Sequence, residues 1–160
     1  NYDNIVTPDG RYWAGGAYMG HRIGWLDTQT GEVWEADTPT KQSNPARGGF
    51  DLHGNGWLGG RGGMLIKIDP KARRITEYPP PIPYDTFYEV MPDKNGEIWA
   101  GGLQSGRFWR FDPTTEQWTG YMMPEPYAHD RRTWIDNSTD PVTVWYVDHN
   151  GYMVRIQPLD

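Results

Sequence analysis

The sequence contains no cysteine and only four histidines among its 160 residues. The absence of cysteine excludes disulfide cross-links, thiol catalysis and cysteine-based metal sites. No apolar run approaches the roughly 20 residues of a membrane-spanning helix. The 15 Lys and Arg residues are outnumbered by 21 Asp and Glu residues, which gives a net charge of −6. We therefore expect neither a nucleic-acid partner, which would require a basic surface, nor a membrane span.

Glycine, proline and large aromatic residues are abundant instead. The chain has 20 Gly, 14 Pro, nine Trp and ten Tyr residues. This composition is typical of many short turns that join aromatic-rich strands, and it disfavours long helices. The length suits one domain, so we expect a single all-β domain over residues 1–160.

A short tryptophan phrase recurs along the chain at a nearly constant spacing. The phrase is Trp-Ala-Gly-Gly or Trp-Leu-Gly-Gly, and its first residues are 44 and 42 positions apart, with a degenerate fourth copy 46 positions further on. In the first three copies a glycine precedes the tryptophan by three positions, as in a tight hairpin. The four copies begin at Trp13, Trp57, Trp99 and Trp145. They divide the chain into units of about 1–40, 41–82, 83–126 and 127–160.

Each of the first three units continues in the same way after its tryptophan. A second strand ends in an aspartate, at Asp27, Asp69 and Asp112, and a turn, an outer strand and a proline-containing crossover follow. With the inner strand that precedes the tryptophan, each unit makes four short antiparallel strands. Such units at a period of about 40–45 residues predict the blades of a β-propeller. We expect all four repeat tryptophans to pack between neighbouring blades.

The strand count predicts an incomplete ring of about 3.5–4 blades. The last unit lacks its outer strand, and residues 1–6 already serve as the inner strand of the first unit. The strand that closes the ring is therefore expected upstream of Asn1 or on another chain. We rank a part of a seven- or eight-bladed ring first, an eight-bladed dimer second and a closed four-bladed ring third. The expected partner is the remainder of a larger propeller chain or a second copy.

The order of strand, turn and tryptophan phrase resembles the streptogramin B lyase (virginiamycin B lyase-like) β-propeller family. The best matches are Leu65–Asp69, Ile75–Pro79 and Met153–Ile156, and the resemblance covers essentially the whole chain. It implies a ring of seven blades and a periplasmic or secreted location. It also implies a carbon–oxygen lyase that opens a lactone by elimination, with Mg²⁺ held by histidine and glutamate on one face of the ring.

The sequence departs from the pattern of that family where the acids should stand. Three units end their tryptophan phrase in Gly16, Gly60 and Gly102, where the family places a glutamate. The resemblance places only Asp148 at the end-of-strand acid, with His149 beside it. We therefore expect a ligand- or partner-binding propeller without streptogramin-cleaving activity. The alternative is a Mg-dependent lyase or hydrolase that acts on a lactone or peptide-like small molecule at the propeller mouth.

Polar residues before the inner strands and after the tryptophan phrases are the candidates for a site, because propeller ligands usually meet these loops. The densest group is residues 127–132, where histidine and aspartate beside two arginines could orient a base and clamp an anion. Together with the family pattern, this predicts His129, His149 and Asp148 as catalytic residues of the alternative enzyme. His21, His129 and His149 are also candidate ligands of a metal. The ligand-binding candidates are Arg47, Arg61, Tyr84, Gln104, Arg131, Arg132 and His21.

Overall fold

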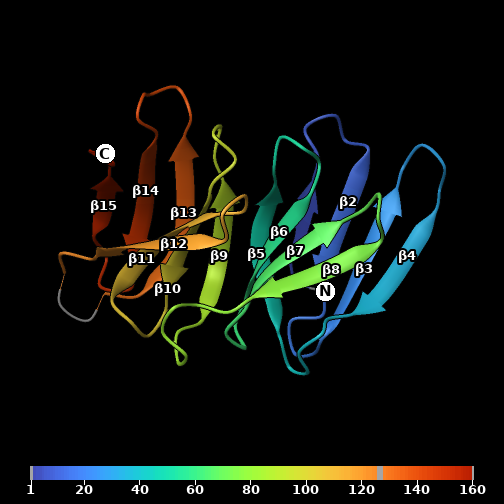
Figure 1. Ribbon diagram of the computed structural model, residues 1–160, viewed down its shortest axis with the longest axis horizontal. Helices are drawn as coiled ribbons and strands as arrows, with labels where there is room; N and C mark the ends of the chain where they lie inside the picture. Colours follow the sequence, from blue (N-terminus) through green and yellow to red (C-terminus); the bar gives the residue numbers. More distant parts are fainter. Residues whose placement is uncertain (1, 126–127, 160) are drawn as a thin grey trace.

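The protein is described by a computed structural model that places residues 2–125 and 128–159. Within these ranges the chain forms fifteen β-strands and no helix (Figure 1). The all-β class predicted from composition and repeat spacing is confirmed. The unit boundary expected between residues 126 and 127 lies outside the described residues, and the other boundaries remain predictions.

The first sheet, called blade 1, contains four antiparallel strands in chain order. Its strands are β1 (Asn4–Val6), β2 (Tyr12–Gly16), β3 (Arg22–Asp27) and β4 (Val33–Asp37). The next eight strands form blades 2 and 3, each again antiparallel. Blade 2 consists of β5 (Pro45–Phe50), β6 (Gly56–Gly60), β7 (Leu65–Asp69) and β8 (Arg74–Tyr78). Blade 3 consists of β9 (Phe87–Pro92), β10 (Ile98–Gly102), β11 (Arg107–Asp112) and β12 (Gln117–Met122).

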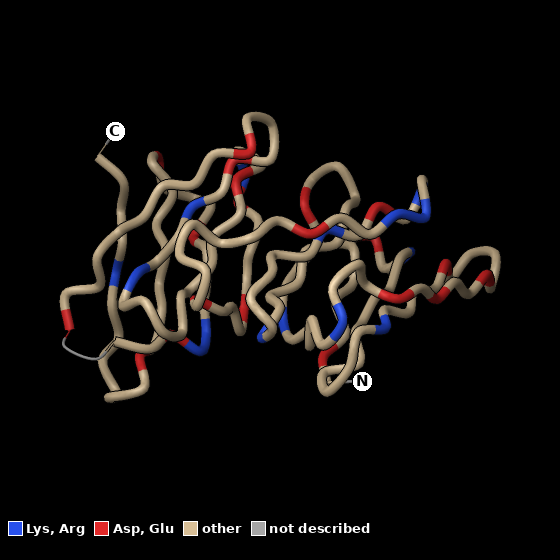
Figure 2. The backbone as a smooth tube through the Cα atoms, turned by 60° about the horizontal axis from the view of Figure 1, so that its bottom comes forward, with Lys and Arg blue, Asp and Glu red and all other residues tan. Residues whose placement is uncertain are grey.

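The inner strands of blades 2 and 3 join the two blades into one eight-stranded sheet. The junction is a single parallel bridge between Arg47 of β5 and Glu89 of β9. Blade 4 contains three strands, β13 (Asp130–Asp136), β14 (Thr143–Asp148) and β15 (Met153–Ile156), in an antiparallel sheet. The blades follow one another along the long axis of the molecule (Figure 1). Acidic and basic residues are interspersed along the chain in the view of Figure 2.

Apolar side chains fill each of the three joints between consecutive blades. Ile5 and Trp25 of blade 1 pack with Ile66 of blade 2. Trp57 of blade 2 packs with Phe87, Ile98 and Phe111 of blade 3, and the third joint holds Trp99, Ile135, Val144 and Tyr146. A single blade cannot bury both of its faces, so the hydrophobic stabilisation of this chain resides in the joints.

An aspartate explains the fixed spacing between the hairpin glycine and the tryptophan in blades 2 and 3. Asp51 Oδ1 accepts hydrogen bonds from the backbone N–H groups of His53 and Asn55, both at 2.9 Å. Its Oδ2 accepts the indole N–H of Trp57 at 2.8 Å, and Gly54 supplies the positive φ of the turn. Asp93 binds the turn of blade 3 and the Trp99 indole in the same way. One buried carboxylate thus fixes both the hairpin and the core side chain.

The four repeat tryptophans do not share one environment. Trp57 and Trp99 are completely buried between blades, as predicted. Trp13 is 43% exposed, and Trp145 is half-buried on the outer side of blade 4. The prediction that the tryptophans pack between neighbouring blades is confirmed for Trp57 and Trp99, whereas neither Trp13 nor Trp145 lies in a joint between two described blades. In blade 1 the face that meets blade 2 carries Ala14 instead.

The hairpin of blade 1 accounts for this difference. In blade 2 the Asp51 N–H donates to the Asn55 carbonyl at 2.9 Å, across the three-residue turn 52–54. Hydrogen-bonded and non-hydrogen-bonded pairs alternate in an antiparallel ladder. Asn55 is in a hydrogen-bonded pair with Asp51, so Trp57, two residues after Asn55, is in a hydrogen-bonded pair with Gly49 of β5. Its side chain consequently points toward blade 3.

In blade 1 the corresponding hydrogen bond runs from the Thr7 N–H to the Tyr12 carbonyl, at 3.0 Å, across the four-residue turn 8–11. Trp13 is opposite Val6 and directly follows the hydrogen-bonded pair, so it occupies a non-hydrogen-bonded position. The turn after β2 is longer as well, because Ala17 bonds to Arg22 across residues 18–21. The pleat of β2 is thereby shifted by one residue, which places Trp13 on the opposite face.

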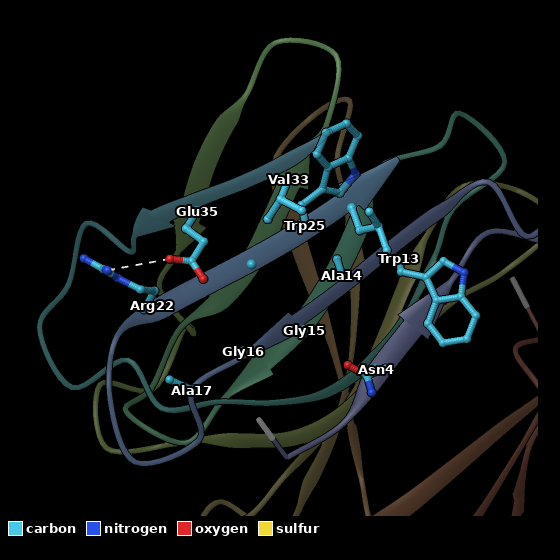
Figure 3. A pocket seen from close by; sticks show the side chains of 12 residues that line it. Asn4, Trp13, Ala14, Gly15, Gly16, Ala17, Arg22, Trp25, Val33 and Glu35 are labelled. Atoms are coloured by element: carbon cyan, nitrogen blue, oxygen red, sulfur yellow. Dashed lines mark ion pairs between the residues drawn. The ribbon is translucent and has the colours of Figure 1, made fainter. Parts of the chain in front are cut away.

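Both outer faces of the blade series expose apolar side chains. On blade 1, Trp13, Leu26 and Val33 are register neighbours that line a hollow of about 380 Å³, and Figure 3 shows Trp13 and Val33 there. The hollow also contains the ion pair between Arg22 and Glu35, with a nitrogen–oxygen distance of 3.8 Å. On blade 4 the exposed apolar residues are Trp134, Val147 and Met153. Such exposure is unusual for an isolated domain and is typical of a propeller that continues beyond these blades.

Candidate functional site

Two sets of loops meet at one end of the blades, which we call the mouth. One set precedes the inner strands, and the other joins the second strand of each blade to its third strand. Backbone hydrogen bonds connect the two sets: Arg61 N–H donates to the Asn44 carbonyl, Leu103 N–H to Thr86 and His149 N–H to His129, at 3.0–3.1 Å. The loops from which the candidate site residues come are therefore neighbours at the mouth.

Tyrosine and arginine side chains from blades 1, 2 and 3 cluster at the mouth. The rings of Tyr2 and Tyr18 stack with their centroids 4.3 Å apart, and the Tyr2 hydroxyl is hydrogen-bonded to the Tyr88 hydroxyl. The guanidinium of Arg47 lies 5.1 Å from the centre of the Tyr2 ring. Arg61 donates a hydrogen bond of 2.5 Å to the Tyr18 hydroxyl. These five side chains are called the tyrosine–arginine cluster below.

Charge within the cluster is unevenly compensated. Arg47 forms an ion pair with Asp3 at 3.3 Å. Burial raises the pKa of the Tyr88 hydroxyl, and its hydrogen bond with Tyr2 raises it further, so Tyr88 is a neutral donor at physiological pH. Among the described residues, the guanidinium of Arg61 interacts with two ring faces and a hydroxyl and forms no ion pair.

A small cavity of about 80 Å³ adjoins the cluster and is lined by residues of all four blades. The side chains that line it are mostly cationic or hydroxyl-bearing. They are Tyr18, Arg61, Tyr88, Leu103, His129 and Arg131. Three of the predicted site residues, Arg61, His129 and Arg131, are thus brought together, although they lie up to 70 positions apart in the sequence.

His129 and His149 lie side by side at the edge of this cavity, with ring centroids 5.6 Å apart. Burial lowers the pKa of His129, and the nearby positive charge of Arg131, together with His149 and Arg61, lowers it further. His129 is therefore neutral at physiological pH. A neutral imidazole can both donate and accept a hydrogen bond.

Asp148 caps its own turn. Its Oδ1 accepts the N–H groups of Asn150 and Tyr152 at 2.7 and 3.1 Å, and its Oδ2 accepts the Asn150 side-chain amide at 3.0 Å. Asp51 and Asp93 make the same turn contacts. The catalytic role that the family pattern suggested for Asp148 remains a prediction, and both of its oxygens are engaged in holding the turn.

The remaining predicted residues lie apart from the cavity. His21 is 3.5 Å from Asp37 on blade 1, and Gln104 accepts a hydrogen bond from the Thr86 hydroxyl at 2.7 Å. Tyr84 is exposed in the segment before β9. Arg132 reaches Glu89 at 3.5 Å, on the other side of its strand.

Glu89 and the three tyrosines were missed at the sequence level, and the complete burial of Asp130, which belongs to the polar group 127–132, was not predicted. Asp130 is fully buried, its Oδ1 has no hydrogen-bond partner among the described residues, and burial raises its pKa to about 7. Burial also raises the pKa of Glu89, which accepts the Thr133 N–H at 2.6 Å. A signal was available for Tyr2 and Tyr88, because they occupy equivalent positions two repeats apart.

The described residues do not fit a magnesium site. They contain no group of three His, Asp or Glu side chains that could hold a metal ion. His21, the third histidine of the predicted metal set, pairs with Asp37 away from His129 and His149. Arg131 is the charged neighbour that acts most strongly on His129, and its positive charge and that of Arg61 would repel a divalent cation.

No family model and no curated protein sequence matches this chain. Among solved structures, a catalytically inactive virginiamycin B lyase from Staphylococcus aureus with quinupristin matches with a TM-score of 0.79 at 16% identity. A streptogramin B lyase structure matches at 0.77 and 20% identity. Each match covers 99% of this chain and 55% of the other chain. An extracellular domain assigned to a one component system of B. thetaiotaomicron matches at 0.70 and 20% identity, over 98% of this chain and 21% of that one.

These similarities bear on the fold alone, because every identity is low. The described part of the chain contains no helix with the length and apolar character needed to cross a bilayer. The chain spans about half the length of the lyases that it matches. It is a partial β-propeller with the blade architecture of the streptogramin B lyase structures.

Proposed function

We propose that this chain is part of a β-propeller that binds a small-molecule or peptide ligand, or a partner protein, at its mouth, without cleaving streptogramins. The observation that carries the proposal is the tyrosine–arginine cluster, in which Tyr2, Tyr18 and Tyr88 meet Arg47 and Arg61 from three blades. Tyrosine and arginine are the residue types enriched at binding hot spots.

The cluster offers both shape and charge to a ligand. The stacked Tyr2 and Tyr18 rings provide a flat amphipathic surface at low conformational-entropy cost. The guanidinium of Arg61 is oriented by the Tyr18 hydroxyl and by two ring faces, at 5.8 and 5.9 Å from their centres. A pre-oriented guanidinium loses little freedom when it forms a planar hydrogen-bonded contact.

Two features favour binding over lyase chemistry. Glycine ends the tryptophan phrase of three units, at Gly16, Gly60 and Gly102, where the family places an acid. The remaining acid at such a position, Asp148, caps a turn with both oxygens.

We further propose that additional blades, from the same polypeptide or from a second copy, complete the ring, and that the protein is periplasmic or secreted.

The binding proposal is tested on the protein at its full natural length. A panel of short peptides and small carboxylic acids is screened by the change in tyrosine and tryptophan fluorescence. Ligands found in this way should bind Tyr18→Ala and Arg47→Gln at least about ten-fold more weakly. Arg74→Gln, which removes an exposed arginine from β8, is the matched control and should bind like the parent. Ligands that bind all three variants equally would overturn the proposal.

The adjacent histidines, 5.6 Å apart, favour a second candidate, a lyase or hydrolase that uses His129 or His149 as an acid or base. Incubation with quinupristin, with and without Mg²⁺, tests it. We expect no ring opening by mass spectrometry. Turnover that disappears in His149→Ala would establish the enzyme instead.

A further inference from the structure

Among the described residues, six of the eleven arginines have a carboxylate within 4 Å. The pairs are Arg11–Asp27, Arg22–Glu35, Arg22–Asp37, Arg47–Asp3, Arg73–Glu32, Arg110–Glu97 and Arg132–Glu89. Arg61 and Arg131 have no carboxylate partner among the described residues. They also line the same cavity. Two unneutralised guanidinium groups in an acidic protein thus lie on one small hollow.

The lining of the cavity is complementary to negative charge. The described residues that line it include no acidic side chain, and the hydroxyl of Tyr18 and the ring of His129 add hydrogen-bond donors. The carboxylate that acts on His129 is that of Asp148, which is already engaged by its own turn. Leu103, which is buried, forms the apolar part of the wall.

The size of the cavity limits what it can hold. Its volume of about 80 Å³ equals that of two to three water molecules, at roughly 30 Å³ each. This is room for a single small group and not for a complete drug-sized ligand, which needs at least about 300 Å³.

We infer that this cavity is a subsite that receives one anionic group of the ligand, a carboxylate or a phosphate, between Arg61 and Arg131. The inference rests on the proposed function, because the rest of the ligand would lie against the stacked tyrosines next to it. Arginine suits this role because its planar fork of donors matches two oxygens of either group. Tyr18 holds Arg61 in place, so the site is partly pre-organised.

Inorganic phosphate and acetate are the two probes, and His129 is the reporter. The imidazole signals of the full-length protein are followed by NMR while each probe is added at low ionic strength. An anion bound beside His129 stabilises the imidazolium form, so the pKa of His129 should rise on binding. If the change in the His129 signals saturates with only one of the two probes, that probe identifies whether the subsite takes a phosphate or a carboxylate. The absence of any saturable shift with both probes would overturn the inference.

Matched variants make the assignment specific. Arg61→Gln and Arg131→Gln should each weaken probe binding by about ten-fold or more, whereas Arg74→Gln should leave it unchanged. Salt should weaken binding, because the site opens to solvent. His149→Gln, which keeps both arginines, should retain the saturable shift, and its loss there would count against the arginine pair.

The failure of this inference can be separated from the failure of the proposed function. If ligands from the peptide and acid panel bind Arg61→Gln and Arg131→Gln as tightly as the parent, but lose affinity for Tyr18→Ala, the mouth binds ligands and the anionic subsite is wrong. If no variant of the tyrosine–arginine cluster changes ligand binding, the proposed function itself is wrong.

Discussion

Blade 1 and blade 2 share one sequence pattern but use it in opposite ways. Trp13 and Trp57 both stand three residues after a hairpin glycine and both begin a Trp-x-Gly-Gly phrase. Trp57 is completely buried against blade 3, whereas Trp13 is 43% exposed on the outer face of blade 1. The two hairpins differ by one residue in the length of their hydrogen-bonded turns. A repeat therefore fixes the strands, while the turn decides which face of the strand enters the core.

Removal of the buried indole should have the largest effect. Trp57→Ala leaves a cavity among Phe87, Ile98 and Phe111 and leaves the Asp51 carboxylate without its indole partner. We expect a loss of about 3–5 kcal/mol in the free energy of unfolding, measured with urea. Trp13→Ala is the matched comparison and should cost about 1 kcal/mol or less. Equal losses at the two positions would show that a further element covers the outer face of blade 1.

The joint between blades 3 and 4 should respond to pH through Asp130. The fold raises the pKa of buried Asp130 from 3.8 to about 7, so the native state keeps a proton that the unfolded chain releases. Stability from this group is complete below about pH 4 and declines as the pH rises toward about 7. The decline should amount to at most roughly 4 kcal/mol.

Asp130→Asn tests the pH effect, because asparagine has a similar shape and does not titrate. Urea unfolding of the parent and of the variant is compared between pH 4 and pH 8. The stability of the variant relative to the parent should increase as the pH rises. His129, whose pKa is lowered by burial, contributes the opposite slope in both proteins and cancels in the difference. A difference that is independent of pH would contradict the assignment.

Removal of a capping aspartate should cause the next largest loss in the free energy of unfolding. Asp93→Ala removes an acceptor of two turn N–H groups and of the Trp99 indole N–H. We expect a loss of about 2 kcal/mol in the free energy of unfolding, because a buried donor is left unpaired. Asp9→Ala in blade 1 should cost less, since Asp9 accepts hydrogen bonds from the Thr7 hydroxyl and the Arg11 N–H near the surface and binds no buried indole among the described residues. A larger loss at Asp9 than at Asp93 would refute the link between capping and indole burial.

The sequence predicts the blades well because their determinants are local. Turn glycines, strand-ending aspartates and crossover prolines mark the hairpins of the first three units, and Trp57 and Trp99 follow as core residues. Which face of β2 carries Trp13 could not be predicted in this way. Six positions separate Thr7 from Trp13 and Asp51 from Trp57 alike, and the two hairpins differ only in which backbone groups pair.

The mouth could be predicted in part. Arg61, His129 and Arg131 were chosen because they stand in loops that a propeller brings together, and they line one cavity. His21 and Tyr84 occupy such loops too, yet they lie apart from it, since loop membership does not determine where a side chain points. The stacking of Tyr2 on Tyr18 depends on contacts between side chains that no spacing rule encodes.

The exchange of turns should have the smallest effect on stability and gives the sharpest test of the comparison. In blade 1, residues 8–11 and 18–21 are replaced by the three-residue turns 52–54 and 61–63 of blade 2. Changing both turns should give β2 the same alternation of side chains as β6, and this should move the Trp13 side chain to the joint with blade 2. Nuclear Overhauser contacts between the Trp13 indole and Leu58 would report the move. Changing one turn alone should instead destabilise blade 1. Pairing with β1 and pairing with β3 would then require the side chains of β2 to point to opposite faces. If Trp13 stays on the outer face after both exchanges, packing against blade 2, and not turn length, determines which face of β2 carries Trp13.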